Sequence, residues 1–117
     1  MTQTVLIVDD QPGFRSRARR VLEDAGYNVV AEAPDGASAL AAAKQLQPAV
    51  VLLDIRLPDI NGFEVALRLT TEREPPAVVL TSSHDASDFA DLIARCGARG
   101  FLAKAELSGP ALAALLR

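Results

Sequence analysis

Short apolar runs alternate with longer segments of mixed polarity along the whole chain. The runs read TVLIV, NVVAEA, AVVLL, AVVL and GFLA, and Gly, Pro, Asn or Asp bounds each of them, as is usual for β-strands. The runs at 4–8 and 49–53 do not alternate between apolar and polar positions, which is typical of central parallel strands covered on both faces. The run at 28–33 is more polar, which favours the edge of a sheet.

Helical periodicity marks the segments between these runs. Pro12, Asp35 and Ser108 stand where helices are expected to begin, and Gly26 and Gly97 stand where helices are expected to end. The residues expected to share apolar helix faces are, in chain order, Phe14, Ala18, Val21, Leu22 and Ala25; Leu40 and Ala41; Phe63, Ala66, Leu67 and Thr70; Phe89, Leu92, Ile93 and Cys96; and Leu112, Leu115 and Leu116.

The strict alternation of strands and helices predicts an α/β fold with a doubly wound, five-stranded parallel sheet and helices on both faces. Right-handed crossovers leave few topologies, and the strand order 2-1-3-4-5 makes the first and third strands neighbours. A chain of 117 residues leaves little room for a second domain, so residues 1–117 are expected to form one. Ligands of such sheets bind beyond the carboxyl ends of the strands.

Charged and polar residues stand at these carboxyl ends. Asp9 and Asp10 follow the first strand, Asp54 ends the third, Thr81 the fourth and Lys104 the fifth. Two like charges 4 Å apart repel by about 4 kcal/mol at an effective dielectric constant of 20, so the carboxylates need protons or a cation. An all-oxygen site favours Mg²⁺ over zinc. A nucleophile, a divalent cation and donors for developing charge are the groups that phosphoryl transfer needs.

The chain resembles a CheY-like response regulator receiver domain over its full length. The stretches that carry the resemblance are VLIVDDQPGFR, PAVVLLDIRLPDINGFEV, VVLTS and GARGFLAK, in this order. The stretches DDQPGFR and FLAKAEL are most similar to the subclass with a LuxR-type helix-turn-helix output domain (NarL/FixJ-like). The resemblance implies a flavodoxin-like (βα)5 fold and a place in a two-component phosphorelay that controls transcription.

The resemblance also implies a role for each strand-end residue. Asp54 would accept a phosphoryl group from the phosphohistidine of a histidine kinase or a histidine phosphotransfer domain. Asp10 would bind Mg²⁺ directly and Asp9 mostly through water, and the backbone carbonyl of Arg56 would complete the protein ligands.

The remaining implied roles concern the phosphoryl oxygens and the switch. Thr81 and Lys104 would hold the phosphoryl oxygens, and Thr81 would act with the aromatic Phe101 as the switch. Residues that would tune the lifetime of the acyl phosphate are Arg56, Ser82 and Ser83.

The chain departs from the family pattern at a few positions. Ala105 follows Lys104 where many receivers have a proline in a cis peptide, so a trans bond is expected. Gln11 stands where the subclass often has His. Phe101 lacks the hydroxyl of the commoner Tyr, so a switch at this position would work by packing alone.

Composition narrows the function further. The net charge is −3 and the isoelectric point is about 5.0, which argues against nucleic-acid binding by this domain. No segment approaches the roughly 20 apolar residues of a membrane span, and the N-terminus lacks a basic signal-peptide region, so a cytoplasmic location is expected.

His84 is interpreted as an exposed loop residue and Cys96 as a buried, inert thiol. A basic run on the first helix is interpreted as a solvated face, with a docking surface for an acidic partner as the alternative; it contains Arg15, Arg17, Arg19 and Arg20.

Other functions remain as alternatives. A phosphatase of the haloacid dehalogenase type would need a second Asp two residues after Asp54, and that position is Arg56. No phosphate-binding glycine motif follows the first strand. The chain is therefore interpreted as a phosphoacceptor signalling domain, whose only chemistry is its own phosphorylation and dephosphorylation. A stand-alone receiver or a pseudo-receiver that acts by protein–protein interaction is the alternative, and a homodimer is an open alternative to a monomer.

Overall fold

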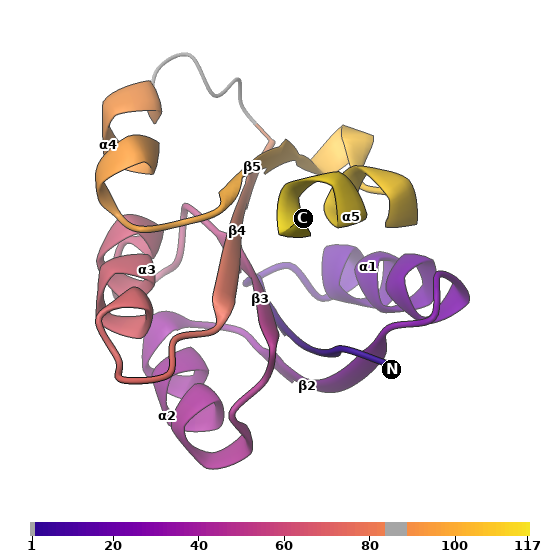
Figure 1. Cartoon of the computed structure of the whole chain (residues 1–117), viewed down its shortest axis with the longest axis horizontal. Helices are drawn as coiled ribbons and strands as arrows, with labels where there is room; N and C mark the ends of the chain where they lie inside the picture. The colour runs from indigo at the N-terminus through magenta and orange to yellow at the C-terminus, as the bar shows by residue number, and fades with distance from the viewer. Residues whose placement is uncertain (1, 84–88) are drawn as a thin grey trace.

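A single parallel sheet, with strands in the order β2-β1-β3-β4-β5, forms the middle of the molecule (Figure 1). The computed structural model describes residues 2–83 and 89–117. The strands are β1 (Thr4–Val8), β2 (Asn28–Ala33), β3 (Val50–Asp54), β4 (Ala77–Ser82) and β5 (Gly100–Ala103). The predicted doubly wound fold and strand order are confirmed, and β2 lies at an edge as its polarity indicated.

Helices cover both faces of this sheet (Figure 1). Their bounds are α1 (Pro12–Asp24), α2 (Gly36–Leu46), α3 (Gly62–Thr70), α4 (Ala90–Arg95) and α5 (Gly109–Leu116), with a short 3-10 helix, η2 (Lys104–Glu106), before α5. Apolar residues of α1 and α5 share one core cluster, whereas those of α2 and α3 belong to the other. No helix of the described part of the chain is both long enough and apolar enough to cross a bilayer.

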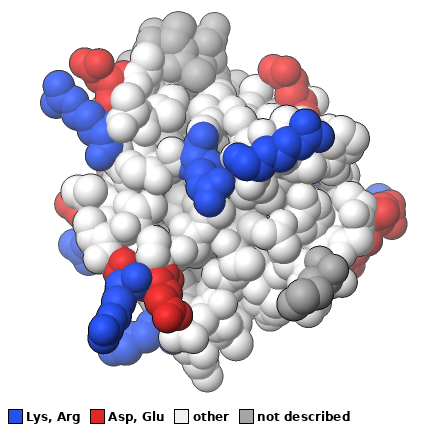
Figure 2. Space-filling model, viewed as in Figure 1, with Lys and Arg blue, Asp and Glu red and all other residues white. Residues whose placement is uncertain are grey.

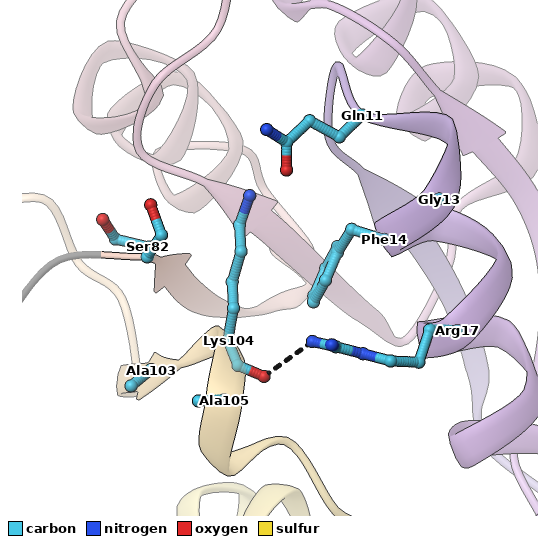
Figure 3. A pocket seen from close by; sticks show the side chains of 9 residues that line it. Gln11, Gly13, Phe14, Arg17, Ser82, Ala103, Lys104 and Ala105 are labelled. Atoms are coloured by element: carbon cyan, nitrogen blue, oxygen red, sulfur yellow. Dashed lines mark hydrogen bonds between the residues drawn. The ribbon is translucent and has the colours of Figure 1, made fainter.

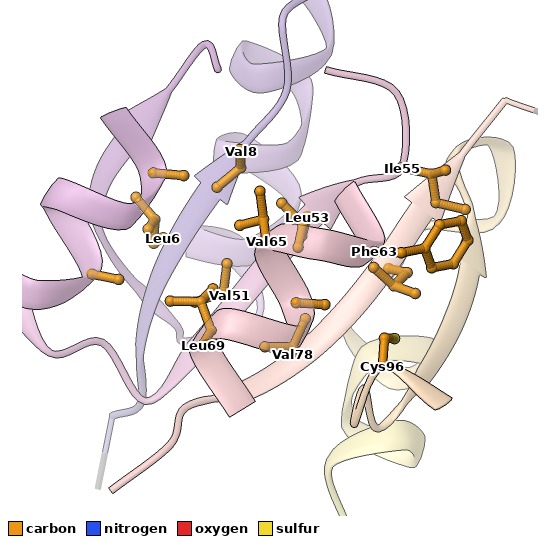
Figure 4. Packing of buried hydrophobic residues seen from close by; sticks show 14 of the residues in the cluster. Leu6, Val8, Val51, Leu53, Ile55, Phe63, Val65, Leu69, Val78 and Cys96 are labelled. Carbon is orange, nitrogen blue, oxygen red and sulfur yellow. The ribbon is translucent and has the colours of Figure 1, made fainter. Parts of the chain in front are cut away.

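The two core clusters are separated by the sheet, because side chains alternate between its faces. In β1, Leu6 and Val8 pack toward α2 and α3, whereas Val5 and Ile7 pack toward α1 and α5. Figure 4 shows the first cluster, where Phe63 and Val65 of α3 lie on the strands. Each fully buried Val or Leu side chain contributes about 1.5–3 kcal/mol to stability. The central strands are thus buried on both faces, as their composition predicted.

Polar residues define the helix ends at the positions that the sequence indicated. The Asp35 carboxylate accepts a hydrogen bond of 2.8 Å from the Ser38 N–H, and the Ser108 hydroxyl accepts one of 3.1 Å from the Ala111 N–H. Gly26 follows α1 with a positive φ of 96°, a conformation that glycine adopts without strain.

None of the described peptide bonds is cis, so the bond before Ala105 is trans as expected.

Four of the predicted helix faces are wrong in part. Ala25 and Ala41 are exposed, and Leu67 and Leu92 are 45% and 47% exposed. In α3 the predicted Phe63 and Ala66 are buried, and Val65 and Leu69 complete the buried face in place of Leu67, so the face that meets the sheet is rotated from the predicted one. The six-residue α4 has no buried residue of its own.

The fourth helix is attached at its C-terminal end. Cys96, which directly follows α4, is buried as expected, and its backbone carbonyl accepts a hydrogen bond of 2.9 Å from the Thr70 hydroxyl.

The interpretation of His84 as an exposed loop residue falls outside the described residues.

Replacing Gly62 with alanine should destabilise the fold and displace the loop between β3 and α3. The added Cβ would lie 2.7 Å from the Ile55 Cα and would also meet the Asp54 carbonyl oxygen. Overpacking of this kind costs about 1–3 kcal/mol. Gly13→Ala is the matched control, since no atom lies within 4 Å of its added Cβ. Alanine at this helical position should be neutral or stabilise by about 0.4–1 kcal/mol. Urea unfolding measures both effects, and a Gly62→Ala variant as stable as the wild type would contradict the close approach.

Candidate functional site

Asp54 ends the buried strand β3, and its side chain stays inside the protein. The residue is 4% exposed and stands opposite Thr81 in the register of β3 and β4. The two strands stay paired just past this point, because the Ile55 N–H donates a 3.0 Å hydrogen bond to the Thr81 carbonyl. A carboxylate in this position is costly to bury without partners.

Two further carboxylates follow β1, the neighbouring strand. Asp9 is fully buried: its N–H donates to the Ala33 carbonyl at 3.0 Å, and its Oδ1 accepts from the Gln11 N–H at 2.8 Å. Asp10 is exposed. One carboxylate oxygen of each of Asp9, Asp10 and Asp54 lies within 4.8 Å of the others. The structure therefore brings together the three carboxylates that the strand order placed side by side.

Lys104 directly follows the carboxyl end of β5, and its side chain reaches this acidic cluster. Its Nζ lies 2.7 Å from Asp9 Oδ2 and 3.3 Å from Asp54 Oδ2, and its side chain is only 11% exposed. The ammonium thus pairs with both buried carboxylates at once. Breaking such a pair by removing one partner leaves an uncompensated buried charge, which is strongly destabilising.

Helix α1 supports Lys104 in a way that the sequence did not suggest. The Phe14 ring lies between the Lys104 and Arg17 side chains (Figure 3), with the Lys104 Nζ 4.8 Å from the ring centroid. Arg17 donates a hydrogen bond of 3.0 Å to the Lys104 carbonyl. The i,i+3 spacing of Phe14 and Arg17, which puts both on one side of α1, was the sequence signal that could have indicated this contact.

An open pocket of about 400 Å³ adjoins Phe14 and Arg17 and is lined by Gln11, Gly13, Phe14, Arg17, Ser82, Ser83, Ala103, Lys104 and Ala105.

The environment changes the acidity of both partners of the ion pair. Burial, and then the negative charge of Asp9, raise the pKa of Asp54, although Lys104 and the Arg56 N–H oppose this change. Burial alone would lower the pKa of Lys104, but the Asp9 and Asp54 carboxylates outweigh it and raise that pKa. Lys104 therefore remains a cation at neutral pH, whereas ionised Asp54 is held at a cost in free energy.

Thr81 carries a buried hydroxyl with an unfilled hydrogen-bonding capacity. The residue is fully buried, and its Oγ1 has no hydrogen-bond partner within the described part of the chain. Leaving such a group unsatisfied costs about 1–3 kcal/mol. A buried unpaired donor beside a carboxylate cluster indicates a place where a ligand oxygen would be bound.

The loop after β3 is held by interactions that sequence reasoning missed. The Asp59 carboxylate accepts hydrogen bonds from the Gly36 N–H at 2.8 Å and the Ala37 N–H at 2.9 Å, and these bonds lower its pKa. The loop is thereby attached to the start of α2. Nearer the site, the Arg56 N–H donates to Asp54 Oδ1 at 3.2 Å, while the Arg56 side chain is exposed.

The other predicted residues lie around the cluster. Ser82 is buried and Ser83 is exposed, and both line the pocket beside Lys104. Phe101 is half-buried and packs on the core cluster that faces α3, next to Leu80 in the sheet register. The cluster itself offers only carboxylate oxygens, the donors that suit a hard cation such as Mg²⁺, so the residues present fit that ion.

A model of the response regulator receiver domain family matches residues 5–116. The chain belongs to this family. Receiver domains are the signalling domains of two-component response regulators, and they typically bind Mg²⁺ at an acidic pocket. A kinase partner is accordingly expected for this receiver domain.

Two curated relatives of the receiver domain are transcription regulators by name. The positive alginate biosynthesis regulatory protein of Pseudomonas aeruginosa is 44% identical over 102 residues, which cover 86% of this chain and 40% of that protein. The transcriptional regulatory protein NarL of Mycobacterium tuberculosis is 42% identical over 101 residues, which cover 86% of this chain and 47% of that protein. The receiver domain described here thus spans less than half the length of either relative.

A solved structure extends the likeness to the whole fold. The signal receiver domain of NarL from Mycobacterium tuberculosis superposes with a TM-score of 0.87 at 36% identity, covering 98% of this chain and 97% of that chain. The predicted flavodoxin-like arrangement of this receiver domain is confirmed.

Asp54→Asn is expected to raise the melting temperature at neutral pH, because it removes a desolvated negative charge that lies beside Asp9. The raised pKa means that the folded state binds more protons than the unfolded state between the ordinary and the folded-state pKa of Asp54. Stability therefore falls as the pH rises through this window. The melting temperature of the wild type should increase on acidification into the window, whereas that of Asp54→Asn should lack this contribution.

Asp10→Asn is the control for this comparison. It removes a negative charge from the same cluster, but the carboxylate that it removes is exposed rather than buried. Its effect on the melting temperature should be smaller. An unchanged or lower melting temperature for Asp54→Asn at neutral pH would contradict a strained acidic cluster.

Proposed function

We propose that Asp54 accepts a phosphoryl group and that this chain is the phosphorylated switch of a two-component regulator. The observation that carries the proposal is the buried Asp54 carboxylate, paired with the Lys104 ammonium at 3.3 Å and adjacent in register to the unsatisfied Thr81 hydroxyl. A nucleophile with a cation and a hydroxyl donor beside it is the arrangement that phosphoryl transfer uses.

The donor is the phosphohistidine of a histidine kinase or a histidine phosphotransfer domain. A carboxylate oxygen of Asp54 forms the new bond to phosphorus as the bond from phosphorus to the imidazole nitrogen breaks. The electron pair of the broken bond stays on that nitrogen, which then carries a proton from solvent. Lys104 and Thr81 donate hydrogen bonds to the phosphoryl oxygens, so negative charge is neutralised where it develops.

The residues that would hold Mg²⁺ are Asp10, Asp54 and the backbone carbonyl of Arg56, with Asp9 acting through water. Asp9 is buried, with its Oδ1 hydrogen-bonded to the Gln11 N–H and its Oδ2 in an ion pair with Lys104 Nζ, whereas Asp10 is exposed, which supports Asp10 as the direct ligand. When bound, the ion supplies positive charge to the phosphoryl oxygens.

The output of this module is proposed to be transcriptional. Residues 1–117 form one receiver domain, and the names of the curated relatives, which are longer, support an output domain elsewhere in the regulator. The receiver itself is acidic, with a net charge of −3, so it is not the part that holds nucleic acid. On the face seen in Figure 2, Lys and Arg side chains form no broad patch: some lie beside acidic side chains, and most of the surface is uncharged. A cytoplasmic location fits this role.

Thr81 and Phe101 are proposed to transmit the signal. Phosphorylation adds roughly −1.5 to −2 charges and strong acceptor oxygens at Asp54. These acceptors would satisfy the Thr81 hydroxyl, and the half-buried Phe101 would turn inward behind it, changing the surface formed by α4, β5 and α5. Moving such an equilibrium from 1:99 to 99:1 takes about 5.5 kcal/mol. Residues that would tune the lifetime of the phosphorylated state are Arg56, Ser82 and Ser83.

Incubation with acetyl phosphate and Mg²⁺ should add one phosphoryl group that hydroxylamine removes, as measured by intact mass. Asp54→Ala should add none. Lys104→Ala should be less stable, because it leaves two buried carboxylates without their counter-charge. The folded protein should also lose the structural response to phosphorylation, because the new charge then lacks its ammonium partner. Lys44→Ala, which changes an exposed lysine of α2, should behave as the wild type. A phosphoryl group on Thr81, Ser82 or Ser83 would overturn the assignment.

A beryllofluoride mimic of the phosphoryl group should shift the NMR resonances of Thr81 and Phe101 together. Phe101→Ala should keep the shift at Thr81 but lose the change at the α4–β5–α5 surface, since the hydroxyl can still reach the mimic. Leu22→Ala, which alters a buried side chain of the other core cluster, on the opposite face of the sheet, serves as the control. A mimic bound at Asp54 with Thr81 and Phe101 unmoved would show that the signal leaves by another face.

A further inference from the structure

The basic run of α1 is not simply a solvated face, because two of its arginines are bound to one glutamate of the edge strand. Arg15 Nε lies 3.2 Å from Glu32 Oε1, and Arg19 Nε lies 2.7 Å from Glu32 Oε2. Each carboxylate oxygen of Glu32 thus binds one guanidinium. Glu32 is opposite Ile7 of β1 in the sheet register, so the interaction lies one strand away from the acidic cluster.

Arg15 also contacts the acidic cluster, through a second nitrogen of its guanidinium group. Its Nη1 donates a hydrogen bond of 2.6 Å to the Asp9 backbone carbonyl. Asp9 is thus held on several sides: its N–H donates to the Ala33 carbonyl, and its Oδ1 accepts from the Gln11 N–H. Its Oδ2 lies 2.7 Å from Lys104 Nζ as an ion pair and accepts no hydrogen bond within the described part of the chain.

The Asp9 carbonyl belongs to the peptide group that joins Asp9 to Asp10. A peptide group is planar, so fixing its oxygen also fixes the direction in which the chain leaves toward the Asp10 Cα. Asp10 is exposed, and packing around its own side chain cannot provide this restraint.

We infer that Arg15, held by Glu32, is a positioning residue for Mg²⁺ binding: it orients the Asp9–Asp10 peptide and thereby aims the Asp10 carboxylate into the site. The inference rests on the proposed function, which makes Asp10 the direct ligand. Residues that orient metal ligands without touching the metal typically change its affinity about 10- to 100-fold when they are replaced. Arg15 suits the task because its rigid planar fork holds two acceptors in a fixed geometry, whereas the donors of an ammonium rotate on a flexible stem.

The inference is separable from a plain charge effect, because the two predict opposite signs. If Arg15 acted only through its charge, its removal would leave the site more negative and Mg²⁺ would bind more tightly. If Arg15 orients Asp10, its removal releases the peptide and Mg²⁺ binds more weakly. A purely structural contribution would lower the melting temperature without changing the affinity of the folded protein.

Titration of the whole chain with MgCl₂, followed by calorimetry and NMR below the melting temperature, tests this. Arg15→Ala should weaken Mg²⁺ binding about 10-fold, the lower end of the range for such residues. Arg20→Ala removes the same charge from an exposed position of the same helix and should bind Mg²⁺ at least as tightly as the wild type. Arg15→Lys keeps the charge but not the fork, so it should also bind more weakly, and it decides the question if Arg15→Ala does not fold.

Asp10→Ala, measured beside these variants, separates the inference from the proposed function. Unchanged affinity in Asp10→Ala would show that the metal site is wrong and would overturn the inference with it. Loss of affinity in Asp10→Ala, with Arg15→Ala and Arg15→Lys both as tight as the wild type or tighter, would overturn the inference alone.

Discussion

The pairing of one ammonium with two buried carboxylates is the constraint on which the rest of the site depends. Lys104 Nζ lies within 3.3 Å of both Asp9 and Asp54, and without it two like charges would be buried side by side. The parallel sheet makes the pairing possible, because the carboxyl ends of β1, β3 and β5 all open on the same edge. A phosphoryl group at Asp54 would compete with the two carboxylates for the same ammonium. Lys104 would then pair with Asp9 and Asp54 before phosphorylation and with the phosphoryl oxygens after it.

Two supporting interactions flank this pairing. Arg15 binds the Asp9 carbonyl, while Asp59 attaches the loop after β3 to the start of α2. The two loops that carry the carboxylates and the Arg56 carbonyl are thus each fixed to a neighbouring element. Groups that are preorganised in this way lose their conformational freedom during folding rather than at the moment of binding.

The sequence predicted the sheet, its strand order and the gathering of carboxylates, because apolar runs and strand-end charges are local signals. It failed where a contact joins distant residues. Nothing local marks Arg15 as a partner of Glu32, which is 17 residues away, or Asp59 as a partner of Gly36, which is 23 residues away. The exposure of Leu67 and Leu92 was missed for a related reason, since periodicity shows that a helix has an apolar face but not which side the sheet covers.

The attachment of α4 has a consequence for the cost of rearranging the output surface. This helix has no fully buried residue, and it meets the core through the partly buried Ile93, the ring contact of Phe89 with Phe63 and the hydrogen bond from Thr70 to the Cys96 carbonyl. Segments with so few buried contacts open with a free energy far below that of global unfolding. α4 can therefore turn as a local event with little disturbance of the sheet, so a small input of free energy is enough to change the surface around it.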